Sequence, residues 1–161
     1  MRYSVCMDYV RWIRSKVGKE PIFLNVANAI IINDTGQILL QRRGGHADET
    51  WSTPGGAMEI GESAQEAVVR EVREETSLEV VVESFVGAYT KDTLVSYPNG
   101  DRCQMILFSF ACRIVGGQLK ADNVETLELR YFDLKSRPPL FRKHLERALN
   151  DYLRGKRGVI S

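Results

Sequence analysis

Three glycines and a run of glutamates lie close together in residues 54–78, a composition suited to holding a cation. Gly55, Gly56 and Gly61 predict an irregular loop in which the backbone can approach a ligand closely. The composition becomes helical immediately after this loop, from Ser63 onward. We therefore expect a glycine-rich loop that leads directly into a helix.

The expected helix begins at Ser63, because Glu66 follows it at the spacing of a capping box. At about 100° per residue, Glu66, Arg70 and Arg73 are predicted to face solvent. The apolar stripe on the other side is predicted to contain Ala64, Ala67, Val68, Val69 and Val72.

Three glutamates near the end of this helix occupy positions that local stability disfavours. Glu71 and Glu75 project towards the apolar side, and Glu74 lies at its margin. Their i, i+3, i+4 spacing costs about 0.2–0.5 kcal/mol per like-charge pair, and the C-terminus of a helix repels anions. A divalent cation reverses this argument, because Mg²⁺ and Mn²⁺ prefer clustered carboxylate and carbonyl oxygens. A charged surface helix is the alternative interpretation.

Residues 56–78 resemble the Nudix box. Gly56, Glu62, the run Arg70-Glu71-Val72-Arg73-Glu74-Glu75 and the apolar Leu78 stand at its spacings. The flanking chain is similar to the MutT-like bacterial Nudix hydrolases at 39–43 (Leu-Leu-Gln-Arg-Arg) and at 51–56 (Trp-Ser-Thr-Pro-Gly-Gly). Ser77 departs from the family pattern, which has glycine there. A serine in a left-handed helix terminus costs about 1 kcal/mol.

The resemblance implies a fold and a reaction. The expected fold is α/β, a Nudix-type α/β/α sandwich with a mixed β-sheet. The expected reaction is the metal-dependent hydrolysis of a nucleoside diphosphate linked to a group X, by water attack at phosphorus, with Mg²⁺ or Mn²⁺ as cofactor. The resemblance leaves X open: ADP-ribose, an oxidised nucleoside triphosphate and a dinucleoside polyphosphate all remain candidates.

Two other functions compete with this reaction. A non-catalytic Nudix domain that senses a nucleotide is the first, although such modules usually have broken box glutamates or an appended DNA-binding segment, and this chain has neither. Isomerisation of an isoprenoid diphosphate is the second. It would need a catalytic cysteine, whereas Cys103 and Cys112 lie in an apolar stretch.

The resemblance also implies roles for single residues. Arg70 would orient the carboxylates by a charge-assisted hydrogen bond. Glu71 is the first candidate for the base and Glu125 the second, while Glu62 would bind metal through water. The implied metal ligands are the Gly55 carbonyl, Glu71, Glu74 and Glu75.

Four residues outside the box are candidates for substrate binding: Arg42, Arg43, Trp51 and Tyr97. The two arginines could contact phosphate or remain solvated at a strand end. Trp51 could stack on a base or simply pack. Tyr97 and Pro98 follow the positions at which Nudix subgroups mark their substrates, so the connection 90–101 is the expected source of specificity. His46 and His144 are expected to have surface roles.

The remaining elements follow from hydrophobic periodicity and turn residues. Apolar residues Tyr9, Trp12, Ile13 and Val17 share one helical face, expected to pack in the core or in a dimer. The expected helices are 8–17, a second that starts at Ser63, and Leu140–Leu153. The expected strands are Phe23–Ile32, Gln37–Arg42, Glu79–Tyr89, Cys103–Val115 and Leu127–Phe132, with turns at Asn33–Gly36 and Tyr97–Asp101 and an exposed loop at Gly44–Thr50.

Composition limits the class of protein. The 161 residues predict one domain, 1–161, and carry 22 Lys+Arg against 21 Asp+Glu, which argues against a nucleic-acid partner or a membrane surface. The longest apolar stretches, Ile22–Ile32 and Cys103–Cys112, fall short of the ~18 residues of a membrane helix. Three cysteines without a CxxC pair indicate neither disulfides nor zinc, so a cytoplasmic location is expected. The expected partner is a small nucleotide diphosphate derivative, and the family resemblance suggests a homodimer.

Overall fold

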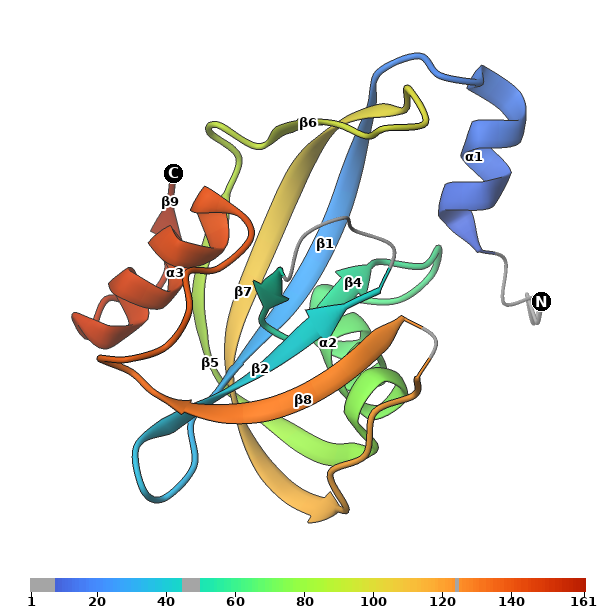
Figure 1. Cartoon of the computed structure of the whole chain (residues 1–161). Helices are drawn as coiled ribbons and strands as arrows, with labels where there is room; N and C mark the ends of the chain where they lie inside the picture. The colour runs from blue at the N-terminus through green and yellow to red at the C-terminus, as the bar shows by residue number, and fades with distance from the viewer. Residues whose placement is uncertain (1–7, 45–49, 124) are drawn as a thin grey trace.

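The computed structural model describes residues 8–44, 50–123 and 125–161, which form three helices and nine strands (Figure 1). The helices are α1 (Tyr9–Val17), α2 (Ala64–Thr76) and α3 (Lys143–Leu153). The strands are β1 (Ile22–Ile31), β2 (Gln37–Arg43), β3 (Trp51–Ser52), β4 (Gly55–Ala57), β5 (Leu78–Tyr89), β6 (Leu94–Ser96), β7 (Arg102–Gly117), β8 (Thr126–Asp133) and β9 (Val159–Ile160).

The strands form two sheets. The larger is mixed, with the order β4-β1-β7-β5-β9 and β6 paired to β7. Its long central pairings are the parallel β1–β7 ladder and the antiparallel β5–β7 ladder. The smaller sheet is antiparallel, with the order β3-β2-β8. The expected mixed β-sheet is therefore confirmed.

Helices α2 and α3 cover opposite faces of the larger sheet, as the alternation along β1 requires (Figure 1). Ala27, Ala29 and Ile31 pack with α2, whereas Ile30 packs with α3. Strand β2 of the smaller sheet contributes to both clusters. This arrangement is the expected helix–sheet–helix layering, and it fixes α2 against the strands that hold the glycine loop.

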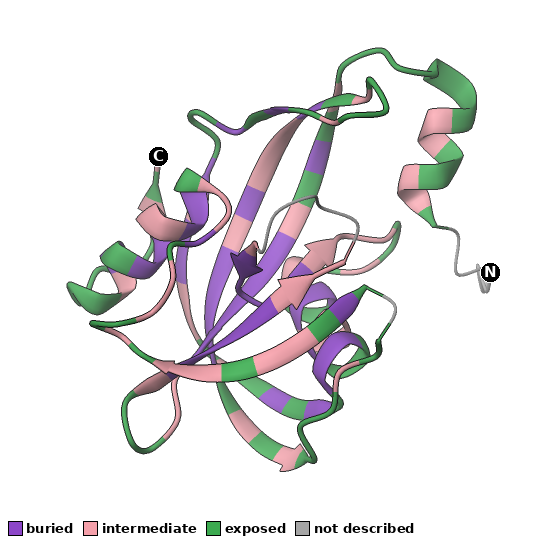
Figure 2. Cartoon of the chain, in the orientation of Figure 1, coloured by how far each residue is buried: buried purple, intermediate pink, exposed green. Residues whose placement is uncertain are grey.

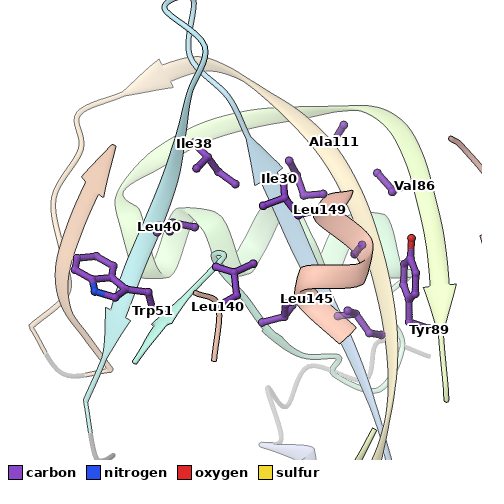
Figure 3. Close-up of a cluster of buried hydrophobic side chains, with 12 residues drawn as sticks. Ile30, Ile38, Leu40, Trp51, Val86, Tyr89, Ala111, Leu140, Leu145 and Leu149 are labelled. Carbon is purple, nitrogen blue, oxygen red and sulfur yellow. The ribbon is translucent and has the colours of Figure 1, made fainter. Parts of the chain in front are cut away.

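The cluster beneath α3 joins both sheets into one core (Figure 3). Leu145 and Leu149 of α3 meet Ile38 and Leu40 of β2, together with Ile30 of β1. The buried residues concentrate in the central strands and on the inner faces of α2 and α3, whereas α1 has none (Figure 2). Burial of apolar area at about 25 cal/mol per Å² stabilises this packing.

Helix α1 forms as expected, but its apolar face does not join the core. Trp12 and Val17 are both more than a third exposed. Helix α1 contacts the rest of the protein through Val10, which packs against the small cluster of Leu24, Val95 and Cys103, and through Arg14, which donates to the Arg102 carbonyl at 2.7 Å. The expectation of core packing was therefore wrong, because α2 and α3 already cover both faces of the larger sheet. Packing in a dimer stays a prediction.

Other boundaries differ slightly from expectation. The last helix starts at Lys143, three residues after the expected start, because the backbone N–H of Leu140 is held by Glu146 before the helix begins. The short strands β3, β4, β6 and β9 had no periodicity to predict them. Within the predicted loop Gly44–Thr50, residues 45–49, including His46, lie outside the described residues. No helix in the described part of the chain is both long and apolar enough to cross a membrane.

Candidate active site

Helix α2 is held at both ends by the residues that the sequence indicated. Ser63 accepts from the backbone N–H of Glu66, while the Glu66 carboxylate accepts from the backbone N–H of Ser63, so the capping box is complete. At the other end Ser77 adopts the left-handed conformation, with φ of 60°. Ala67, Val68 and the rest of the inner face are buried, which fixes the rotation of the helix.

Glu75 is the most deeply buried carboxylate of the site, with 2% of its surface exposed. Its Oε2 accepts from the backbone N–H of Gly55 at 2.8 Å. Burial raises the pKa of Glu75 to about 7, although the Arg43 guanidinium acts in the opposite direction. A side chain at Gly55 would lie 2.3 Å from the Ala27 carbonyl, so only glycine allows β4 to approach β1 and reach Glu75.

Glu71 faces the next glycine of the loop. A Cβ on Gly56 would lie 2.5–2.7 Å from the carboxylate atoms of Glu71, so the missing side chain makes room for that group. Burial raises the pKa of Glu71, and Arg70 and Arg43 partly offset this effect. Glu74 stands at the rim with 61% of its side chain exposed. The predicted inward position of Glu71 and Glu75, with Glu74 at the margin, is confirmed.

Arg70 connects the carboxylates to the loop. It donates from Nε and Nη2 to the two oxygens of Glu62, at 3.0 and 2.7 Å, and from Nη2 to the Ala57 carbonyl. Its Nη1 donates to Glu71 at 2.8 Å and to Glu74 at 3.2 Å. The Glu62 carboxylate in particular raises the pKa of Arg70, which keeps it charged.

The helical projection of Arg70 towards solvent was wrong, since its side chain is only 25% exposed. A long arginine side chain can bend back along the helix surface, and here it covers the loop instead of entering water. Burial works to raise the pKa of Glu62, yet Arg70 and the backbone N–H of Glu59 hold it below its usual range. Both Glu62 oxygens are therefore engaged by protein donors.

Arg43 and Arg42 lie on opposite sides of β2, because side chains alternate along a strand. Arg43 donates to the Gly55 carbonyl at 3.1 Å and lies 3.8 Å from Glu75 and 3.7 Å from Glu125. It thus links the loop after β7 to the box. Arg42 instead pairs with Glu128 of β8 at 3.3 Å. Of the two candidate phosphate contacts, the geometry favours Arg43.

Trp51 lies in the core and not at an open surface, with 8% exposure. The Trp51 side chain belongs to the buried cluster shown in Figure 3. Its indole packs edge-on against Phe132 with ring centroids 4.7 Å apart, and the Arg130 guanidinium lies over it. This placement fits the packing interpretation and leaves no face of the ring free to stack on a base.

A cavity of about 300 Å³ adjoins the box and is bordered by Gly55, Gly56 and Arg43. Tyr97 lines it, as its candidacy for substrate binding required, and burial raises the pKa of its hydroxyl. The cavity extends from Gly55 and Gly56 to the start of α3. Its other polar and aromatic lining residues are Asn28, Ser52, Thr53, Phe141, Arg142 and His144.

The expected environment of His144 was wrong, and several other cavity residues had no predicted role. His144 was expected at the surface but is only 3% exposed. Its position at the start of α3, beside Leu145, turns it inward. Asn28 could have been noticed, because it is the second asparagine of a strongly apolar strand and is buried in the sheet. Phe141 and Arg142 precede a helix and carried no signal.

The donor set near Gly55 suits a hard divalent cation. Glu75 Oε1 is sealed from solvent and makes no close hydrogen bond within the described residues. Arg43 Nη1 lies 3.8 Å from it and donates to the Gly55 carbonyl, and the Glu71 carboxylate is near enough to raise the pKa of Glu75 by its charge. No group of three or more acidic, His or Cys side chains in the described residues is already gathered around a common point. Arg70 contacts Glu71 and Glu74, and Arg43 lies beside Glu75, so both arginines help to position the carboxylates.

Comparison with known proteins decides the family. The NUDIX domain model matches residues 23–151, which include the smaller sheet, the larger sheet except β9 and the first residue of β1, α2 and most of α3. This chain belongs to the NUDIX family. Membership confirms the resemblance that the residues of the box indicated. The chain is therefore a Nudix hydrolase, an enzyme that cleaves a nucleoside diphosphate linked to a group X.

Two curated Nudix relatives and one solved structure illustrate the similarity. An ADP-ribose pyrophosphatase of Methanocaldococcus jannaschii is 37% identical over 144 residues, or 87% of this chain and 80% of the relative. A Bacillus subtilis protein, named provisionally as an 8-oxo-dGTP diphosphatase, is 35% identical over 134 residues, 83% of this chain and 82% of its own. A NUDIX hydrolase structure from Nitrosomonas europaea superposes with a TM-score of 0.69 at 24% identity, covering 86% of this chain and 93% of that one, and so supports the fold.

Proposed function

We propose that this Nudix hydrolase cleaves nucleoside diphosphate sugars of the ADP-ribose type in a reaction that depends on Mg²⁺ or Mn²⁺. The carboxylates that contact Gly55 and Gly56, two glycines that also line a 300 Å³ cavity, carry this proposal. The 37% identity to the archaeal ADP-ribose pyrophosphatase supports the choice of sugar. The cytoplasmic location and the single domain over 1–161 stay predictions, as does the homodimer.

Glu71, Glu74, Glu75 and the Gly55 carbonyl would hold the cation, whose charge would neutralise the diphosphate and polarise water. Glu75 is anchored to Gly55 and supplies a fixed ligand. Arg70 positions Glu71 and Glu74 through the same guanidinium nitrogen. Arg43 contacts the Gly55 carbonyl and is the cationic side chain nearest to the end of the cavity where a diphosphate would lie.

Two carboxylates compete for the role of base. Glu71 is partly buried with a raised pKa, which suits proton abstraction near neutral pH. Glu125 is 67% exposed and lies near Nη2 of Arg43, whereas Glu75 lies near Nη1, so Glu125 could reach the same space from the loop before β8. We favour Glu71 because the box itself orders it, through Arg70 on one side and Gly56 on the other.

The decisive experiment is a hydrolysis screen with purified full-length protein. ADP-ribose, a UDP-sugar, 8-oxo-dGTP and a dinucleoside polyphosphate would each be incubated with Mg²⁺, Mn²⁺ or EDTA, and products separated by chromatography. We expect AMP and ribose 5-phosphate from ADP-ribose, with no turnover in EDTA. Preferred cleavage of 8-oxo-dGTP would contradict the choice of sugar. Binding without cleavage across the whole panel would favour the sensor alternative.

A further inference from the structure

The cavity beside the box has a polar group that the box chemistry does not use. His144 lies in the first turn of α3 and lines the cavity, with 3% of its surface exposed. Neither ring nitrogen makes a hydrogen bond to the described part of the chain, and neither is among its sealed, unpartnered atoms. The imidazole nitrogens are therefore open to the cavity. A buried polar group usually has a hydrogen-bond partner. For His144 that partner would be a ligand bound in the cavity.

The charge state of His144 decides what it can bind. Burial, together with the nearby Arg142 and Arg147 cations, lowers its pKa to about 4. The ring is consequently neutral at neutral pH and offers one donor and one acceptor nitrogen. It is suited to hydrogen-bonding a neutral polar edge of a ligand and poorly suited to binding phosphate.

The rest of the cavity favours a flat heterocycle over a sugar. Leu24, Val26 and Leu107 give the cavity apolar walls. The several hydroxyl groups of a ribose would find no hydrogen-bond partners on these walls. Phe141 lies at the same end, with the Arg142 guanidinium 4.1 Å from its ring centroid. Aromatic and guanidinium planes are surfaces on which nucleobases stack.

Asn28 is the other candidate for reading a ligand in this cavity. Its Nδ2 is already bound to Thr53 Oγ1 at 2.7 Å, and its Oδ1 is sealed from solvent. The side chain is therefore fixed as part of the floor. His144 alone, of these two buried residues, presents an open and unpartnered polar atom.

We propose that His144 is a specificity-determining residue that hydrogen-bonds the edge of the nucleobase while the diphosphate lies near Gly55 and Arg43. This assignment rests on the proposed function, since it places the nucleoside end of the substrate in this cavity. The expected ligand is a nucleoside 5′-phosphate. The edge of its base that faces His144 carries both a hydrogen-bond donor and an acceptor. Such a site rejects a base that leaves the imidazole unpaired.

The test separates recognition of the base from catalysis. Full-length wild type, His144→Phe and His144→Asn would be titrated by calorimetry with AMP, GMP, CMP, UMP and ribose 5-phosphate, without metal. His144→Phe keeps a planar ring and removes both nitrogens. We expect the wild type to prefer one base by tenfold or more, and His144→Phe to reduce that preference to within about threefold.

Met105→Leu is the matched control, because Met105 lines the same cavity with an apolar side chain. It should keep the preference of the wild type. If His144→Phe does not fold, as judged by thermal unfolding, His144→Asn decides, and it should change which base is preferred. An unchanged preference in the variant that folds would overturn the assignment, as would an equal loss of affinity for ribose 5-phosphate.

Failure of the proposed function is distinguishable from failure of this assignment. The base preference in these metal-free titrations is read without turnover, so it is tested whether or not the enzyme cleaves ADP-ribose. With a cleaved substrate, His144→Phe should raise KM about tenfold and change kcat less than threefold. A fall in kcat with constant KM would contradict a role in binding the base.

Discussion

Each functional side chain at this site is defined by one or two specific neighbours. Glu75 is positioned by the Gly55 backbone, and Glu71 occupies the room that Gly56 leaves. Arg70 gathers the carboxylates of Glu62 and Glu71 around one guanidinium. Such fixed geometry reduces the reorganisation needed when substrate and cation bind. The effect of single substitutions should therefore be large on activity and small on stability.

Substitution of Glu71 or Glu75 by glutamine should lower turnover by about 10²–10⁴-fold, because each change removes a carboxylate charge at the reaction centre. Folding should persist, since glutamine has nearly the same shape. Turnover of ADP-ribose with Mg²⁺ and circular dichroism check the two statements. Glu79→Gln, an exposed carboxylate on β5, is the control and should behave like wild type. Near-wild-type turnover in Glu71→Gln or Glu75→Gln would refute their assignment.

Gly56→Ala should lower kcat about tenfold or more, because its methyl group would displace the Glu71 carboxylate. Gly116→Ala is a matched control: its Cβ also meets a glutamate oxygen, Glu79 Oε2 at 2.7 Å, but far from the site. Initial rates and urea unfolding of both variants check this prediction. A Gly56→Ala enzyme within twofold of wild type would show that Glu71 tolerates displacement.

At the scale of elements, α2 is the part that carries the chemistry, and its ends decide where its glutamates lie. The capping box fixes its start, and the buried Val68 and Val72 fix its rotation against the larger sheet. Its end is less favourable, because Ser77 occupies a left-handed conformation that glycine adopts more easily. The C-cap of α2 therefore lowers the stability of the protein through Ser77, a residue outside the reaction centre.

Ser77→Gly should raise the free energy of unfolding by about 0.5–1 kcal/mol, since glycine removes the steric cost of φ near 60°. Urea denaturation of both proteins measures the difference. Ser77→Ala keeps a Cβ in the same conformation and should gain nothing. Activity should stay unchanged in both, because Ser77 contacts no carboxylate of the site. A less stable Ser77→Gly protein would contradict this account of the cap.

For the whole molecule, burial of ionisable groups links stability to pH. His144 has its pKa lowered to about 4 by burial and by neighbouring cations, whereas an unfolded histidine titrates near 6.5. The folded state thus binds the proton less readily than the unfolded state. The stability contributed by neutral His144 is full above pH 6.5 and is lost as pH falls towards 4.

Lowering the pH from 7.5 to 5 should cost the wild type about 2 kcal/mol more than it costs His144→Phe. Phenylalanine does not titrate, so the difference between the two proteins isolates the histidine. Urea unfolding at several pH values in one buffer series measures it. Parallel loss of stability in both proteins would show that His144 is not protonated on unfolding in this range.

The sequence by itself determined the family, the chemistry and the residues of α2. Fixed spacing from Gly56 to Leu78, together with a helical period, was enough to place Glu71 and Glu75 inward and Glu74 at the rim. Those relations are local, within one loop and one helix. A short segment can specify them because helix geometry repeats every 3.6 residues.

Only the tertiary structure decided which distant residues join the site. Arg43 rather than Arg42 reaches Gly55 because the pairing of β2 with β8 sets Arg42 opposite Glu128 and, after a register shift, Arg43 opposite Thr126. Trp51 enters the core and His144 the cavity because the smaller sheet and α3 close over them. Pairing between segments a hundred residues apart leaves no periodic mark in the sequence, so the cavity that receives the substrate emerges only when the chain folds.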